Sequence, residues 1–352
     1  MNTAHSPQND AIFRDQFGRD KRKLRISVTD RCNFKCVYCM PEHPQWMKKH
    51  DLLSFEQLYA FCEFMVRRGI ESIRITGGEP LMRQGVVHFI AQLQQLKALG
   101  LKRISMTTNG HYLAQYATAL KQAGLDDLNI SLDSLDDAQF YQLTQKQLQP
   151  VLEGIRAVQQ LGFAIKINTV LIKGVNDNQI LALTRWAKQE NLALRFIEFM
   201  PLDGDQQWSQ QQVVTEHEIL SILKTEFELL LKLEQGSDPA RSYWVDQTLV
   251  GIISTISHAF CGQCDRLRMS AQGEFYHCLF ATQGLNLKTM IQQLAAGEAN
   301  AERQLQQQLT PYIWTKAAGF AAIQQQATLD QFTPQNSQKT TTRKISMHMI
   351  GG

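Results

Sequence analysis

The sequence predicts an α/β protein in which an incomplete TIM-like barrel of six β-α units, (βα)6, precedes a C-terminal α+β element. Strand-like and helical segments alternate six times before Pro201. After Pro201 the pattern changes to short strands and glutamine-rich helical stretches. The chain has 352 residues, and single cores stop growing at about 250–300 residues. The length therefore suits one barrel with an appendage, or two domains.

The strand-like runs of the barrel are residues 24–29, 72–76, 103–108, 128–132, 164–172 and 193–200. Helical segments such as 86–99 and 151–161 separate them. A capping box of Ser54 and Gln57 begins the first helix, whose apolar face places Cys62 in the core. Parallel strands with right-handed crossovers bring their carboxyl ends together, so we expect the active-site residues there.

The chain divides into four predicted regions: residues 1–23 as an N-terminal extension, 24–201 as the barrel, 202–338 as the C-terminal region and 339–352 as a tail. A second capping box, Thr215 with Glu218, predicts a helix that ends near Leu230. Further strands are expected at 242–245 and 249–256, a hairpin at 266–270 and 274–279, and helices at 287–296 and 302–309.

Composition excludes several classes of protein. The net charge of +3 is too small for a broad nucleic-acid or acidic-membrane surface. No apolar run approaches the roughly 20 residues of a membrane span, and residues 1–23 lack a signal-peptide core. We therefore expect a cytoplasmic protein without nucleic-acid or membrane partners. Seven cysteines in a reducing compartment indicate metal binding or redox chemistry rather than disulfides.

The first cysteine motif, Cys32-x3-Cys36-x2-Cys39, directly follows the first predicted strand. Three thiolates on one tight loop can hold three irons of a [4Fe–4S] cube and leave the fourth iron open for reaction. A zinc site that borrows a distant histidine is the alternative, although structural zinc usually pairs its cysteines.

The second strand ends in Thr76-Gly77-Gly78-Glu79-Pro80. Paired glycines let a ligand approach the main chain closely, and the carboxylate of Glu79 could meet an ammonium group.

The second cysteine motif is Cys261-x2-Cys264-x13-Cys278. If it holds a [4Fe–4S] cluster, that cluster also has an open iron, because the remaining Cys62 faces the core. An open iron is useful to a cluster that binds substrate.

Structural zinc with His258 or His277 as the fourth ligand is the competing interpretation of this motif. The neighbouring residues argue against it. Arg266 and Arg268 occupy alternate strand positions and point to one face, where guanidinium groups favour phosphate.

The three-cysteine loop and the Gly-Gly-Glu-Pro strand end together resemble the radical S-adenosylmethionine enzymes. In that superfamily the open iron chelates the methionine moiety, and an electron from the cluster cleaves S-adenosylmethionine to a 5′-deoxyadenosyl radical. The resemblance implies that Tyr38, Gly78, Ser131 and Met200 line the S-adenosylmethionine site.

From Leu24 to Gly352 the chain resembles the GTP 3′,8-cyclase family of molybdenum cofactor biosynthesis. The most specific part is the pairing of residues 31–36, Arg-Cys-Asn-Phe-Lys-Cys, with residues 260–268, Phe-Cys-Gly-Gln-Cys-Asp-Arg-Leu-Arg. Residues 202–258 and the glutamine-rich 291–338 match only loosely. The resemblance implies two [4Fe–4S] clusters with GTP between them. The implied GTP contacts are Arg25, Arg74, Thr107, Lys166, Arg266, Leu267 and Arg268.

The implied reaction begins when the radical abstracts the ribose 3′-hydrogen of GTP, after which C3′ attacks C8 of guanine. Reduction gives 3′,8-cyclo-7,8-dihydro-GTP, the first intermediate of molybdopterin biosynthesis. A separate cyclic pyranopterin monophosphate synthase consumes it. Arg266 and Arg268 are the candidates for orienting the substrate. The reaction also implies a reducing electron donor. A homodimer is compatible with the resemblance.

The C-terminal residues 343–352 alternate apolar side chains at Ile345, Met347 and Met349, which a solvated tail does not require. A terminal Gly-Gly is shared with the family, in which the tail reaches into the active site. Gly351 and Gly352 lack side chains and can thread into a crowded cavity. We therefore expect them to help hold the substrate.

Two other functions remain open from the sequence. A peptide-modifying radical enzyme would share the first cysteine motif but would usually need more C-terminal cysteines for fully ligated auxiliary clusters. A zinc-dependent nucleic-acid binder would need a basic, aromatic surface, which a net charge of +3 does not promise.

Overall fold

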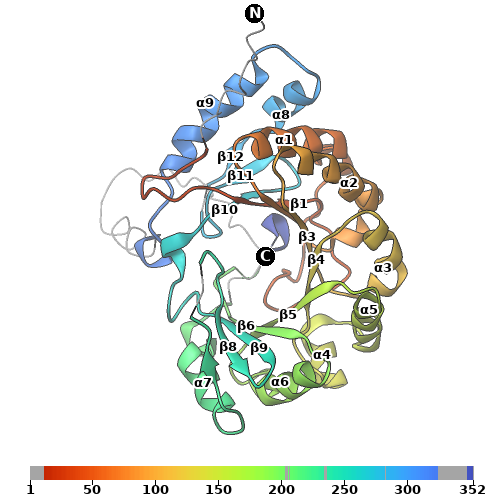
Figure 1. Ribbon diagram of the computed structural model, residues 1–352, viewed down its shortest axis with the longest axis vertical. Helices are drawn as coiled ribbons and strands as arrows, with labels where there is room; N and C mark the ends of the chain where they lie inside the picture. The colour runs from red at the N-terminus through yellow and green to blue at the C-terminus, as the bar shows by residue number, and fades with distance from the viewer. Residues whose placement is uncertain are drawn as a thin grey trace, which may run out of the picture.

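The computed structural model describes residues 12–202, 205, 207–233, 236–281, 283–323 and 347–351. Within these residues, a 12-stranded sheet has the order β12-β11-β10-β1-β2-β3-β4-β5-β6-β9-β8-β7. Figure 1 shows this sheet curled into an open barrel with helices around its outside. All neighbours from β10 through β1 and β6 to β9 are parallel. The predicted α/β barrel is confirmed.

The first six strands are β1 (Lys23–Ser27), β2 (Ser72–Thr76), β3 (Arg103–Thr108), β4 (Asp127–Ser131), β5 (Ala164–Leu171) and β6 (Ala193–Glu198). The helices that cover them are α1 (Phe55–Arg67), α2 (Val86–Leu93), α3 (Leu113–Gln122), α4 (Asp137–Thr144), α5 (Gln149–Gln160) and α6 (Gln179–Gln189). The capping box at the start of α1 is present, because Gln57 N donates to Ser54 Oγ at 3.2 Å and Ser54 N to Gln57 Oε1 at 2.9 Å.

The C-terminal strands extend the barrel at both edges. They are β7 (Leu230–Leu231), β8 (Arg241–Val245), β9 (Thr248–Ile253), β10 (Arg266–Met269), β11 (Glu274–Tyr276) and β12 (Leu285–Asn286). Strand β9 pairs with β6 and β10 pairs with β1. The α+β region after Pro201 thus shares the sheet of the barrel, so its hairpin β10–β11 lies beside the first strand.

The C-terminal helices differ in length from their prediction. Helix α7 (Glu216–Leu223) begins at the predicted capping box but ends before Leu230, which pairs with β8 instead. Helices α8 (Lys288–Ala295) and α9 (Ala301–Trp314) cover the barrel next to α1. The predicted polar linker before the tail lies outside the described residues. No helix in the described part of the chain is long and apolar enough to cross a membrane.

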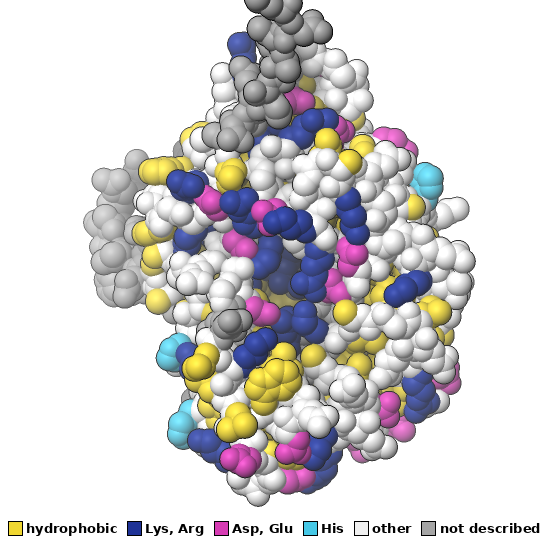
Figure 2. All heavy atoms as spheres, in the orientation of Figure 1, with side chains coloured by type: hydrophobic (Ala, Val, Ile, Leu, Met, Phe, Trp, Pro, Cys, Tyr) yellow, Lys and Arg dark blue, Asp and Glu magenta, His cyan; other side chains and the backbone are white. Residues whose placement is uncertain are grey.

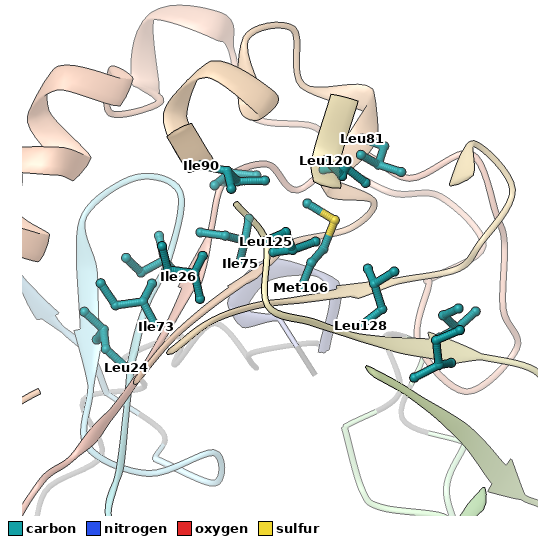
Figure 3. Packing of buried hydrophobic residues seen from close by; sticks show 14 of the residues in the cluster. Leu24, Ile26, Ile73, Ile75, Leu81, Ile90, Met106, Leu120, Leu125 and Leu128 are labelled. Atoms are coloured by element: carbon teal, nitrogen blue, oxygen red, sulfur yellow. The ribbon is translucent and has the colours of Figure 1, made fainter. Parts of the chain in front are cut away.

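Strand alternation separates an apolar outer face of the barrel sheet from a polar inner face. Figure 3 shows Ile73, Ile75 and Met106 packed toward Ile90 of α2 and Leu120 of α3. Residues between these positions point the other way, into the barrel, because successive strand side chains alternate. Cys62 on α1 has no exposed surface, which confirms its place in the core.

Candidate functional site

The inside of the barrel contains a cavity of about 210 Å³ whose lining is dominated by cations. Its cationic lining residues are Lys23, Arg25, Arg74, Arg103, Lys166, Arg195, Arg266, Arg268 and Lys316. Figure 2 shows Lys and Arg side chains gathered around the central hollow. Strand register places Arg25 level with Arg74 on β2 and with Arg268 on β10. A multiply charged anion is the ligand that such a cavity favours.

Burial and repulsion between neighbouring cations lower the pKa values of several of these side chains. Burial, followed by the neighbouring Arg195 and Arg103, lowers the pKa of Lys166 to about 8. Burial likewise lowers the pKa of Arg74 and of Arg268 to about 10. The positive charges of Lys166, Arg74 and Arg268 are therefore costly, and a bound polyanion would offset that cost.

The structure brings nearly all sequence-predicted nucleotide contacts together. Arg25, Arg74, Thr107, Lys166, Arg266 and Arg268 all line the cavity. Leu267 is the exception, because its side chain is fully buried in the apolar core on the other face of β10. Only the main chain of Leu267 is left to meet a ligand.

Four cations of the cavity were not predicted from the sequence: Lys23, Arg103, Arg195 and Lys316. Arg103 and Arg195 lie on predicted strands at inward positions, so the period-two pattern that places Arg74 could have found them. Arg195 forms an ion pair with Asp238 at 2.6 Å, and Lys23 pairs with Asp265 at 3.1 Å. Lys316 carries no comparable sequence signal.

The first cysteine loop lies at the carboxyl end of β1. Phe34 N donates to Cys32 Sγ at 3.4 Å, and Asn109 Nδ2 lies 3.7 Å from the same sulfur. Burial raises the pKa of Cys32 to about 12 and also raises the pKa of Cys36 and Cys39. Metal binding to these thiols would therefore have to release their protons, because the thiolate is the form that ligates a metal.

The Gly-Gly turn after β2 packs directly against this loop. A Cβ on Gly78 would lie 2.3 Å from the carbonyl oxygen of Arg31, so a side chain there would displace the cysteine loop. Gly78 N also donates to Thr29 O at 2.8 Å. Glycine is therefore required at position 78 for close approach of two main chains.

Glu79 lies between the loops that follow β2 and β3. Its carboxylate is fully buried and accepts hydrogen bonds from Leu81 N, Thr108 Oγ1 and Asn109 N at 3.1, 2.9 and 2.8 Å. Desolvation raises its pKa to about 7. The carboxylate therefore joins the β2 and β3 loops, and Oε2 accepts only one of these three bonds.

The other predicted S-adenosylmethionine residues occupy the carboxyl ends of the strands or the loops after them. Tyr38 is buried, and its hydroxyl donates to Asp133 Oδ2 at 2.6 Å. Because that hydroxyl is engaged, the main chain of Tyr38 is the part available to a ligand. Ser131 is half-buried at the end of β4, and Met200 lines the cavity just after β6.

The second cysteine motif lines the cationic cavity. Cys261, Cys264 and Cys278 all contribute to its wall. Burial alone would raise the pKa of Cys264, but Arg266 and Lys316 lower it to about 6. Arg266 Nη2 lies 3.6 Å from Cys264 Sγ. The second motif therefore has a cationic setting, unlike the first.

Zinc and iron–sulfur clusters place different demands on the cysteine motifs. Tetrahedral zinc needs its ligands within about 2.0–2.3 Å of one ion. Across the described ranges, no three His, Cys, Asp or Glu side chains converge on a single-ion site. A cube instead spreads three thiolates over three irons. His258 is exposed, and burial lowers the pKa of His277 to about 4.

Residues 347–351 of the C-terminal tail lie inside the barrel. Figure 1 shows the short helix α11 (Met347–Ile350) at its centre. Ile350 is buried, and Gly351 has φ +67°. A Cβ on Gly351 would lie 2.2 Å from Thr76 Cγ2, so position 351 requires glycine for conformation and for space. Gly352 lies outside the described residues.

Family models match two consecutive parts of the chain. The Radical SAM superfamily model matches residues 26–187, and the Molybdenum Cofactor Synthesis C model matches residues 192–322. In fold, the chain is similar to SuiB of Streptococcus suis bound to S-adenosylmethionine (TM-score 0.59, 12% identity, 82% of this chain and 69% of that one). The structure of anSMEcpe with bound AdoMet is also similar (TM-score 0.52, 15% identity, 80% and 82%). Fold and site define a radical S-adenosylmethionine enzyme.

Curated relatives specify the family. The GTP 3′,8-cyclase of Staphylococcus epidermidis is 35% identical over 352 residues, which is 97% of this chain and 99% of the relative. The GTP 3′,8-cyclase of Streptomyces coelicolor is 41% identical over 295 residues, 82% and 86% of the two chains. The chain belongs to the GTP 3′,8-cyclase family.

Proposed function

We propose that this chain converts GTP to 3′,8-cyclo-7,8-dihydro-GTP, the first step of molybdenum cofactor biosynthesis. The observation that carries the proposal is the cationic cavity that the second cysteine motif lines. A triphosphate has about four negative charges, and charge-assisted hydrogen bonds to guanidinium groups are strong. Arg25, Arg74 and Lys166 supply such donors from three strands of the barrel.

The two cysteine motifs are assigned one [4Fe–4S] cluster each. Cys32, Cys36 and Cys39 hold the first, and Cys261, Cys264 and Cys278 hold the second. When bound, the first cluster and S-adenosylmethionine supply the 5′-deoxyadenosyl radical that starts the reaction. The main chain near Tyr38 and Gly78, together with Ser131 and Met200, binds S-adenosylmethionine.

The cavity residues orient the nucleotide for cyclisation. Arg266 and Arg268 share the inward face of β10, and Arg266 also lies beside Cys264. These two guanidinium groups hold GTP against the second cluster. Arg268 also donates a hydrogen bond to the main-chain carbonyl of Gly351, so the same side chain serves the substrate and positions the end of the chain.

The partners follow from the chemistry. The proposed reaction consumes electrons, so a reducing electron donor must act on the enzyme. The product requires a downstream enzyme, which is cyclic pyranopterin monophosphate synthase. Clusters on half-buried cysteines fit a reducing compartment, the cytoplasm.

A peptide-modifying radical enzyme is the competing function. One solved structure of SuiB contains the precursor peptide SuiA, but at 12% identity that similarity concerns the fold alone. The relatives at 35% and 41% identity are GTP 3′,8-cyclases, which favours the nucleotide substrate.

Metal analysis and product analysis test the proposal together. After anaerobic reconstitution we expect about eight irons per chain and no stoichiometric zinc, because each cube has four irons. Four irons with one zinc would refute the second cluster. Incubation with GTP, S-adenosylmethionine and a reductant should give the cyclic nucleotide, and cleavage of S-adenosylmethionine without it would refute the assigned substrate.

A further inference from the structure

The N-terminal segment of residues 12–22 lies against the second cysteine motif. Residues Arg14 and Asp20 form a β-bridge, and the segment turns at Gly18, where φ is +75°. Its end is joined to the motif by the main chain, because Arg22 N and Lys23 N both donate to Asp265 O at 3.0 and 3.1 Å. The segment therefore has a fixed place beside the motif.

Two cations of this segment bind main-chain carbonyls of the cysteines themselves. Lys21 Nζ donates to Cys264 O at 2.9 Å, and Arg19 Nη1 donates to Cys261 O at 2.7 Å. The carboxylate of Asp15 accepts from Lys21 Nζ at 2.6 Å and from Arg19 Nε at 2.7 Å. The side chains of Lys21 and Asp15 are completely buried.

A third cation completes the arrangement at the remaining cysteine. Lys316 Nζ donates to the carbonyl of His277, the residue before Cys278, and Lys316 is 3% exposed. Each cysteine of the second motif thus has a largely buried cation on its own or the adjacent carbonyl. We call Asp15, Arg19, Lys21 and Lys316 the cation clamp.

Stability alone does not account for such a cluster. Burying an ammonium group costs several kcal/mol, and apolar residues of similar size often stabilise a protein as well as a buried ion pair does. In the clamp, Arg19 and Lys21 both pair with the carboxylate of Asp15, and Lys316 adds a third cation on a main-chain carbonyl, so its three positive charges exceed its one negative charge. A group held by three thiolates is anionic and would compensate that excess.

We propose that the cation clamp positions the second cysteine motif and raises the reduction potential of the group that the motif holds. The inference rests on the proposed second cluster. Nearby cations stabilise the more negative, reduced form of a cluster, and hydrogen bonds and charge around it set its potential. The clamp residues are positioning residues, because they act through the cysteines.

Lys21→Met is the sharpest test, because it removes one charge while Asp15 keeps its ion pair with Arg19. The full-length chain with Cys32, Cys36 and Cys39 replaced by serine isolates the second cluster. In that background Lys21→Met should lower the ratio of reduced to oxidised cluster about tenfold at a fixed potential, which is 59 mV for a one-electron couple. The iron-free variant should also exchange amide hydrogens of residues 261–265 several-fold faster.

Lys316→Met provides an independent variant should Lys21→Met fail to fold, and it should shift the potential in the same direction. Lys97→Met is the matched control, because Lys97 is an exposed lysine paired with Asp126 at 2.9 Å. The proposed role of the cation clamp would be overturned by an unchanged reduction potential and unchanged amide hydrogen exchange in both clamp variants. An equal shift of the potential in Lys97→Met would overturn it as well. A serine background that binds no iron would instead overturn the second cluster.

Discussion

The guanidinium of Arg268 donates a hydrogen bond from Nη1 to the main-chain carbonyl of Gly351. Residues 83 positions apart are thereby joined inside the barrel. Arg268 also lines the cavity level with Arg25, so the tail and the cationic wall meet at one side chain. Arg268 therefore connects the proposed substrate site with the position of Gly351.

Gly351→Ala should reduce cyclisation at least about tenfold while fold and iron content stay intact. The new methyl group would collide with Thr76, and an alanine at φ +67° costs about 1–2 kcal/mol. Product formation and thermal unfolding are the measurements. Gly174→Ala is the control, because Gly174 has φ +73° with no atom within 4 Å of an added Cβ. Equal loss in both variants would contradict a specific role for the tail.

Deletion of Gly351 and Gly352 should also abolish cyclisation without loss of iron, because the cysteine motifs do not depend on the last two residues. Product analysis and iron determination on the same preparation check this expectation. A truncated enzyme that forms the cyclic product at the full rate would show that the tail has no part in the reaction.

Cys36→Ser should abolish cleavage of S-adenosylmethionine, whereas Cys264→Ser should leave some uncoupled cleavage. The reason is the proposed division of roles, in which the first loop serves S-adenosylmethionine and the second motif contacts the substrate. The yield of 5′-deoxyadenosine measures cleavage. Equal loss in two folded variants would contradict this division of roles.

Lys166→Ala and Arg266→Ala should each weaken GTP binding by about 1.5–3 kcal/mol, the worth of a hydrogen bond to a charged group. S-adenosylmethionine binding should change less. Equilibrium binding of both ligands is the measurement, with the exposed Lys97→Ala as control. Unchanged GTP affinity in both cavity variants would remove these residues from the site.

GTP affinity should fall as pH rises above about 8. In the empty cavity the pKa of Lys166 is lowered to about 8, and a bound triphosphate raises it again. Binding therefore requires proton uptake at higher pH, whereas below pH 8 the ammonium is already charged. Titrations between pH 7 and 9.5 check this, and Lys166→Met should flatten the profile. An identical slope in that variant would contradict the assignment.

Local patterns predicted the barrel well. Strands β2 and β3 match their predicted residues, because alternation with flanking turns defines them locally. The capping box at Thr215 likewise located the start of α7, whereas its end was wrong because Leu230 joins a strand pair with Trp244. The attachment of β9 and β10 to opposite edges depends on pairing between distant residues, which alternation does not encode.

In the site, too, features set by local spacing were predicted, and contacts between distant residues were not. Both cysteine motifs and the cavity residues Arg25, Arg74, Arg266 and Arg268 follow from spacing and from the family resemblance, whereas Arg103 and Arg195 were missed. The hydrogen-bond partners of Glu79 could not be predicted from the sequence, because Thr108 and Asn109 donate to it from the end of the next strand. Lys21 lay in a segment that looked like a polar extension, since its contact with Cys264 spans 243 positions.

Isotope transfer tests the central claim most directly. The enzyme with both clusters is incubated anaerobically with S-adenosylmethionine, a reductant and GTP that carries deuterium at C3′ of the ribose. We predict 3′,8-cyclo-7,8-dihydro-GTP together with 5′-deoxyadenosine that has gained one deuterium. Undeuterated 5′-deoxyadenosine with unchanged GTP would contradict the proposed function.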